Sequence, residues 1–326
     1  MNFFFKVKHY VRPYIFPSAF FFNKANLSKK EALSEFYPVQ GYSANIQTAK
    51  WTFDDSGIPL GLYNGSWQGE LAKRVHISGL CECFFGFGEL DRVEDQFLII
   101  DFIVDNLNVG ESIDSEFKYH YWKTFISEES DDYFVHGMGQ GQILSVLTRA
   151  ELLGYPQSLD HYISGVVNSF RLPISHSNGF VSDDLGDVIL QEYPHLLSTF
   201  PSVLNGWLYG LIGMNDAIKA GYGDAEFEAL YLASLSTLKR QLPTYDVGFW
   251  SLYNQPASIL NICSAHYQCQ HIVLLQALGK LEHDYTLLEY SDRFSRQQSS
   301  LMCRALALVT KVAANVLKYK RLYKFK

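Results

Sequence analysis

The stretch VLNGWLYGLI (residues 203–212) carries the clearest helical pattern in the chain. Its apolar side chains recur as adjacent pairs about one turn apart: Val203 and Leu204, Trp207 and Leu208, Leu211 and Ile212. Pairs at this spacing cover one broad face of an α-helix. The stretch therefore predicts a strongly apolar helix.

Segments on both sides of this stretch share its period. They predict helices over Leu71–Phe84, Phe97–Leu107, Ile143–Ala150, Leu159–Phe170, Phe227–Leu238, 267–281, 284–294 and 299–317. The helix that begins near Phe227 is expected to end at Leu242-Pro243, because proline disrupts a helix interior. Consecutive helical pairs bury their apolar stripes when they stack in a ring. We therefore predict a mainly α fold, an (α/α) toroid or barrel of stacked helical hairpins, complete or incomplete.

Residues 1–66 differ from the rest in their poor helical period and many turn residues. The run DDSGIP (54–59) is a turn signal, so small extended or β segments are expected beside it. We divide the chain into an N-terminal arm, 1–66, and an α/α barrel domain, 67–326. The second part includes an irregular insertion at 111–136 and a basic tail at 311–326.

Composition and charge limit the classes of function. Of 326 residues, 48% are hydrophobic and 19% are charged, which suits a chain with a packed core. Residues 13–310 carry 18 basic and 34 acidic side chains, so no nucleic-acid partner is expected. The basic tail fits either an anionic polymer or membrane surface, or a solvated helix end.

Apolar runs and cysteines bear on the compartment. No apolar run reaches about 18 residues and no secretory signal is recognised, so we expect no integral membrane segment and no export. Five cysteines, an odd number, favour reduced thiols, and without paired C-x-x-C spacing buried thiols are favoured over zinc. A cytoplasmic protein is expected, with the basic tail as its route to a membrane surface.

Loops at the ends of the hairpins are where chemistry is expected. They are expected over the irregular stretches 111–136, 182–194 and 243–266. The segment GMGQGQ (137–142) lacks the spacing of a phosphate-binding loop. Its glutamines suit hydrogen bonds to a neutral polar ligand, and its glycines suit a tight packing turn. Aromatic and polar clusters follow at 191–194, 242–253 and 265–272. Each cluster, taken singly, is more often packing than function.

Taken in order, the motifs form a specific set: Met138–Gln142 with Arg149-Ala150, Glu192–Pro194, Val203–Gly206 with Leu211–Gly213, Leu242–Gly248 with Ser251 and Tyr253, and Tyr267 with His271-Ile272. Over residues 133–295 this set resembles the C-terminal domain of the D-glucuronyl C5-epimerases. The long β-barrel insertion of the animal enzymes is absent. Asn254-Gln255-Pro256 stands where the family often has Asp-Leu-Arg, and one family histidine after Tyr267 is lost.

The resemblance implies an α/α barrel whose groove takes a uronic-acid polysaccharide of the heparosan or heparan type. Within the polymer, C5 of D-glucuronate is inverted to give L-iduronate, without a redox cofactor or a metal. The family's functional tyrosines map onto Tyr193, Tyr253 and Tyr267, and its acidic neighbour maps onto Glu192. Homodimers are common in the family, so the resemblance also implies a dimer.

The implied chemistry assigns roles to these residues. The C5 proton lies next to a carboxylate, and inversion needs a proton-transfer group on each face of the sugar. We expect Tyr253 and Tyr267 as this pair, Glu192 as an alternative base and Tyr193 as a donor or orienter. Candidate donors to the substrate's carboxylate and hydroxyls are Gln140, Gln142, Asn205, Tyr245, His266 and His271. Arg149 is a weaker candidate, two turns into its helix, where it suits packing.

Three alternatives remain open. A polysaccharide lyase removes the same C5 proton and then expels the 4-linked sugar. A glycoside hydrolase needs two opposed carboxylates, for which loop residues such as Glu192 and Asp246 are available. A glycan-binding protein without turnover is favoured by the loss of the family's arginine near Pro256.

Overall fold

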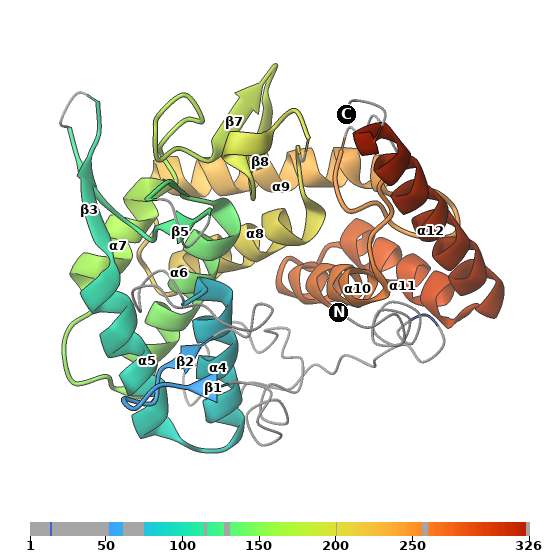
Figure 1. The fold of residues 1–326 in the computed structure, drawn as a ribbon. Coiled ribbons are helices and arrows are strands. Elements are labelled where there is room, and N and C mark those ends of the chain that lie inside the picture. The colour runs from blue at the N-terminus through green and yellow to red at the C-terminus, as the bar shows by residue number, and fades with distance from the viewer. Residues whose placement is uncertain are drawn as a thin grey trace.

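The computed structural model describes residues 14, 52–60, 75–113, 116–126, 131–199, 201–255 and 260–323. Within them the chain is mainly helical (Figure 1), which confirms the class expected from the sequence. The toroid or barrel of stacked hairpins, complete or incomplete, stays a prediction. So does the division at residue 66, because most of the N-terminal arm lies outside the described residues.

Two helices in extensive contact form the centre, α6 (Gly137–Leu153) and α8 (Leu204–Lys219). The stretch 203–212 thus supplies the first half of the central helix α8. The helices α4 (Ile77–Glu89) and α5 (Val93–Asn106) pack against α6. On the other side (Figure 1), α10 (Ala265–Leu281) packs against α8 and is followed by α11 (Tyr285–Ser299). The remaining helices are α7 (Asp160–Ser169), α9 (Ala225–Tyr245) and α12 (Leu301–Tyr323).

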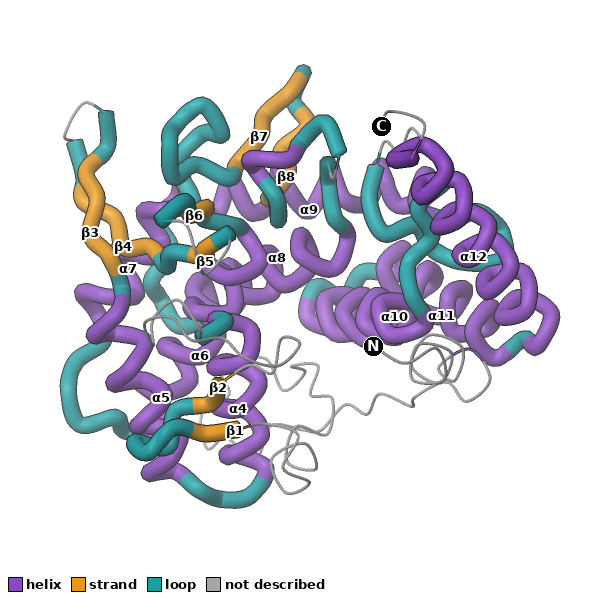
Figure 2. The backbone as a smooth tube through the Cα atoms, viewed as in Figure 1, coloured by secondary structure: helices purple, strands orange, loops and turns teal. Residues whose placement is uncertain are grey.

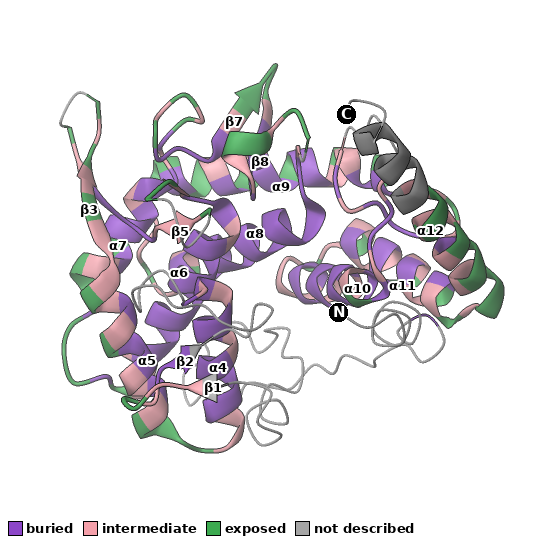
Figure 3. Cartoon of the chain, viewed as in Figure 1, coloured by how far each residue is buried: buried purple, intermediate pink, exposed green. Residues whose placement is uncertain are grey.

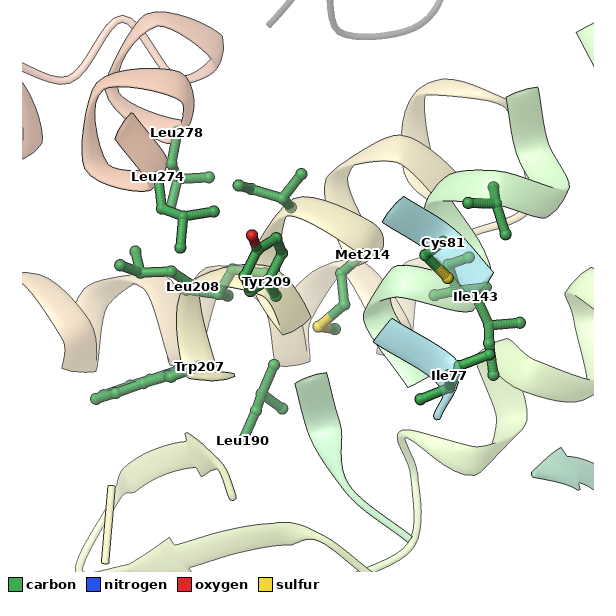
Figure 4. Packing of buried hydrophobic residues seen from close by; sticks show 14 of the residues in the cluster. Ile77, Cys81, Ile143, Leu190, Trp207, Leu208, Tyr209, Met214, Leu274 and Leu278 are labelled. Carbon is green, nitrogen blue, oxygen red and sulfur yellow. The ribbon is translucent and has the colours of Figure 1, made fainter. Parts of the chain in front are cut away.

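A continuous apolar core joins these helices. Figure 4 shows Leu208 and Tyr209 of α8 directed toward Leu274 of α10, with Ile77 and Ile143 on the far side of Met214. Burial of such side chains is the main favourable contribution to folding. In Figure 3 the buried residues accordingly concentrate on α6, α8 and α10, between the outer helices.

Helices α6 and α8 approach each other through glycines. A Cβ at Gly213 would lie 2.0 Å from the carbonyl oxygen of Gly141 and 2.4 Å from its Cα. Both atoms belong to backbone, which cannot move aside without shifting a whole helix. The absence of side chains at these two positions therefore sets the distance between the central helices.

Replacing Gly213 by alanine should lower the free energy of unfolding by about 3 kcal/mol, because overpacking a rigid crossing forces the backbones apart. Chemical denaturation measures this loss. Gly210→Ala is the matched control on α8, since its Cβ would meet the flexible end of Leu190 at 2.7 Å. It should cost clearly less, and equal losses in the two variants would contradict this account of the crossing.

Short antiparallel hairpins occupy the helix ends (Figure 2). They pair β1 (Thr52–Phe53) with β2 (Pro59–Leu60), β3 (Asn108–Glu111) with β4 (Lys118–Tyr121), β5 (Thr124–Phe125) with β6 (Tyr133–Phe134), and β7 (Val181–Asp184) with β8 (Asp187–Leu190). The turn predicted at 54–59 is confirmed, because Asp54 Oδ1 accepts from the backbone N–H groups of Ser56 and Ile58.

Two local expectations are corrected. The irregular stretch 182–194 contains the β7–β8 hairpin, whose alternation is too short to stand out in the sequence. Helix α9 runs through Pro243 to Tyr245, although the sequence predicted an end at Leu242-Pro243. A proline so close to the C-terminus removes little of the ladder of helix hydrogen bonds. Among the described residues, no helix has both the length and the apolar character needed to cross a bilayer.

Candidate active site

Glu192 follows strand β8, and its neighbour Gln191 fixes the chain at this point. The backbone N–H of Gly137 donates to Gln191 O at 2.9 Å, so the start of α6 is tied to the end of β8. The Gln191 side chain accepts from Ser202 N at 2.9 Å and donates to Ser182 Oγ at 2.8 Å. Glu192 is therefore held beside the turn that leads into α8.

The carboxyl group of Glu192 lies against the first turn of α8, where the chain has no side chain. A Cβ at Gly206 would lie 2.3 Å from Glu192 Oε2 and 2.8 Å from Glu192 Cβ. Glu192 is 4% exposed, and its Oε2 has no hydrogen-bond partner. Gly206 thus leaves space for the Glu192 carboxyl group in the protein interior, where Glu192 Oε2 has no partner.

Burial sets the proton affinity of this carboxyl group. Loss of solvation raises the pKa of Glu192 to about 7, while hydrogen bonds from the phenols of Tyr193 and Tyr253 act in the opposite direction. A carboxyl group with a pKa near neutrality exchanges protons readily at physiological pH, as a general base requires.

Tyr253 reaches the same place from the loop after α9. The N–H of Leu204, at the start of α8, donates to Tyr253 O at 3.1 Å, which attaches this loop to the central helix. The Tyr253 hydroxyl donates to Glu192 Oε1 at 3.5 Å. Burial, and then the negative charge of Glu192, raise the pKa of Tyr253 far above its usual range. Tyr253 is therefore a neutral hydrogen-bond donor.

The other two tyrosines complete the cluster. Tyr267, in the first turn of α10, has its ring centroid 5.0 Å from that of Tyr253. Tyr193 is hydrogen-bonded to both Glu192 and Tyr253, and burial raises its pKa as well. The structure thus brings together Glu192, Tyr193, Tyr253 and Tyr267, which the sequence places on three separate segments.

A partly open edge borders this cluster. Phe134 on β6 lies 6.1 Å from Tyr193 and 4.2 Å from His195, measured between ring centroids. His195 is exposed, and so is His266, whose ring lies edge-on to Tyr267 at 5.5 Å. Aromatic faces and imidazole donors side by side suit contact with a sugar that carries hydroxyl and carboxylate groups.

His271 follows Tyr267 by four residues on α10 and has no exposed surface. Its Nδ1 is 2.7 Å from Ser251 Oγ, and Ser251 Oγ also donates to Gln268 Oε1 at 2.6 Å. Burial lowers the pKa of His271 to about 3, so the imidazole is neutral. These bonds tie the Tyr253 loop to α10, which makes His271 a positioning residue for Tyr253 and Tyr267.

The remaining expected donors lie elsewhere or are engaged within the protein. Gln140 bonds to Trp122 N, His120 O and Ser169 Oγ, and Gln142 accepts from Ser78 Oγ. Tyr245 donates to Ser202 O at 2.5 Å from a fully buried position. Arg149 forms a buried ion pair with Asp216 between α6 and α8. Asn205 donates from Nδ2 to Met138 Sδ at 3.9 Å, but its buried Oδ1, at the start of α8, has no partner and can accept a hydrogen bond.

Some residues around the site escaped the sequence analysis. His195 stands two positions after Tyr193 and could have been noticed beside Pro194. Phe134 carries no sequence signal, since its strand has two residues. Gly206 is part of the motif at 203–206, but nothing in the sequence indicated the carboxyl group that lies beside it. Over the described ranges, no group of three or more His, Cys, Asp or Glu side chains is placed to hold a metal ion.

The segment that contains this cluster lies within the range of a family match. Residues 111–296 match the family model described as D-glucuronyl C5-epimerase C-terminus. The chain is 31% identical over 177 residues to the D-glucuronyl C5-epimerase of Caenorhabditis elegans, which covers 48% of this chain and 27% of that protein. It is 27% identical over 132 residues to an uncharacterized protein of Methanocaldococcus jannaschii, covering 40% of this chain and 41% of that one. The chain thus matches less than half the length of either relative.

Proposed function

This chain belongs to the D-glucuronyl C5-epimerase family, and from that premise we propose that it inverts C5 of D-glucuronate residues within a uronic-acid polysaccharide. The observation that carries the proposal is a buried carboxyl group, Glu192, with a pKa of about 7 among three phenols. Removal of the C5 proton, next to the substrate carboxylate, requires a base of this strength that is shielded from bulk water.

The proposed reaction is a proton transfer on each face of the sugar. Ionised Glu192 takes the C5 proton, and the electron pair of the C–H bond passes into the adjacent carboxylate to give an enolate-like dianion. The hydroxyl of Tyr267 then delivers a proton to the opposite face of C5. Glu192 ends protonated and Tyr267 ends as a phenolate, and exchange with solvent restores both. No electron is gained or lost overall, so the reaction asks for no redox cofactor.

This assignment differs from the pair expected from the sequence, Tyr253 with Tyr267. Two rings with centroids 5.0 Å apart are in direct contact, and a sugar ring has no room between them. The strongly raised pKa of Tyr253 also keeps its hydroxyl protonated, so that no phenolate is available to act as the base. We therefore assign Tyr253 to donating a hydrogen bond, first to the Glu192 carboxylate and then to the developing charge on the substrate.

Charge on the substrate has to be balanced by donors from the site. The neutral phenols of Tyr193 and Tyr253 lie beside Glu192, and His266 and His195 lie at the open edge. We assign the imidazoles to donating to the substrate carboxylate, and Asn205 Oδ1 to accepting from a sugar hydroxyl. Such fixed donors stabilise a developing dianion more than mobile water does, because they need no reorientation during the reaction.

Incubation of N-acetylated and N-sulfated glucuronate polymers in heavy water, followed by proton–carbon NMR, tests the proposal. Deuterium should enter C5 and iduronate signals should grow. An unsaturated uronate, visible by its ultraviolet absorption, would instead identify a lyase. Binding of polymer without deuterium at C5 would identify a glycan-binding protein without turnover. Each of these two outcomes would replace the epimerase assignment.

A further inference from the structure

Helix α12 presents an uncovered apolar face. Five large side chains on it are exposed: Leu301 (73%), Met302 (71%), Leu306 (46%), Val309 (66%) and Val312 (53%). At 3.6 residues per turn these positions fall on one stripe, which runs along more than three turns. Figure 3 shows the exposed residues along the outer side of this helix.

The opposite side of α12 is attached to the body of the protein, so the stripe cannot turn inward. Ala307 is fully buried, and Arg304 donates to the carbonyl oxygens of Gln298 and Ser299. Lys311 Nζ donates to Ile262 O at 2.6 Å. These contacts fix the rotation of the helix about its own axis, and the apolar stripe therefore faces solvent in the folded protein.

Continuous exposed apolar surface of this kind marks an interaction site more often than single exposed residues do. Elsewhere in the described chain, exposed large apolar residues such as Leu232 on α9 and Leu185 in the β7–β8 turn occur singly on their elements. The stripe on α12 is different because its members are contiguous along one helix face.

The charge of this part of the sequence indicates what covers the stripe. Residues 293–326 contain nine lysines and arginines and no aspartate or glutamate, although the whole chain carries a net charge of −7. A second copy docked through the same stripe would bring two such basic segments together, which is unfavourable. A negatively charged surface relieves that repulsion and accepts the apolar side chains as well.

We propose that α12 is a docking helix for an anionic lipid surface. The stripe from Leu301 to Val312 enters the boundary between headgroups and acyl chains, and the positive charge of this part of the sequence attracts anionic headgroups. This arrangement combines the two contributions that hold amphipathic helices at membranes, apolar burial and attraction to anionic headgroups. It does not depend on the reaction proposed for the site.

Sedimentation of the full chain with vesicles tests this proposal. Vesicles of equal parts phosphatidylglycerol and phosphatidylcholine should bind the protein about tenfold more than pure phosphatidylcholine vesicles, and 0.5 M salt should weaken the binding. Val309→Glu should reduce binding to the anionic vesicles about tenfold. Leu232→Glu, the same kind of change at an exposed position of α9, should leave it unchanged.

Three results would overturn the proposal. One is absence of binding to the anionic vesicles by the unaltered protein. Another is equal binding by the Val309→Glu and Leu232→Glu variants with unchanged circular dichroism. The third is a dimer in analytical ultracentrifugation that Val309→Glu converts to monomer, without vesicle binding, since that would assign the stripe to a second copy of the chain.

Discussion

Replacing Glu192 by glutamine is expected to lower C5 deuterium uptake from D-glucuronate polymers by about a thousandfold or more. Glutamine has nearly the same shape and keeps the contact with Gly206, but it cannot accept the C5 proton. In the unaltered protein, uptake should rise with pH through an apparent pKa of about 7, because only the ionised carboxylate is a base. NMR of substrate in heavy water, measured between pH 5 and pH 9, tests both statements.

The same substitution should stabilise the folded protein at high pH. The pKa of Glu192 is about 7 in the folded state against 4.5 for an unperturbed carboxyl group. Between these values the folded state binds more protons than the unfolded state, so stability falls as pH rises. Above pH 7 the cost approaches about 3 kcal/mol, and glutamine removes it. Below pH 4.5 both states bind the proton, and this effect is absent.

Glu228→Gln is a matched control, because Glu228 is exposed on α9. It should change neither the deuterium uptake nor the pH dependence of the free energy of unfolding. A Glu192→Gln variant that retained the uptake of the unaltered protein would remove Glu192 from the proton transfer. A variant that lost uptake but gained no stability at pH 8 would show that the carboxyl group is not held in a desolvated place.

Replacing Tyr267 by phenylalanine should separate exchange from inversion. Glu192 can still take the C5 proton of D-glucuronate and return a deuteron to the same face, so glucuronate deuterated at C5 should accumulate. The opposite face has lost its proton donor, and iduronate formation should fall by about a hundredfold or more. The NMR experiment in heavy water distinguishes the two products.

Two further variants give this prediction its controls. Tyr253→Phe should slow exchange and inversion together. Tyr253 donates to Glu192, and both reactions begin with proton removal by Glu192. Tyr285→Phe, an exposed position at the start of α11, should change neither. If Tyr267→Phe lost exchange as completely as inversion, the division of the two faces between Glu192 and Tyr267 would be wrong.

The helical class of the fold was predictable, because its signal is local. The period in residues 203–212 identifies α8 without any knowledge of its partners. Strands of two to four residues, such as β5 and β8, are too short to produce a comparable pattern. The stretch 182–194 therefore looked irregular, although it contains the hairpin that leads directly to Glu192.

The residues of the candidate site could be named in advance only from the resemblance to a family. How they are arranged in space could be seen only from the folded structure. Glu192 and Tyr253 are 61 residues apart, and they meet because the start of α8 is bonded to the Tyr253 backbone. No local pattern encodes such a meeting. Polar side chains inside helices were ambiguous for the same reason. Gln140 and Arg149 find partners within the protein that only the tertiary structure reveals.

The space that Gly206 leaves beside Glu192 makes the pKa of the Glu192 carboxyl group depend on the size of the residue at position 206. One methyl group there would displace the carboxyl group from the buried position that raises its pKa. Evolution could therefore move the optimum pH of such an enzyme by altering a position that touches no substrate. Among relatives, glycine at the position equivalent to Gly206 should accompany a carboxyl group with a pKa near neutrality, and a larger residue there should accompany loss of activity.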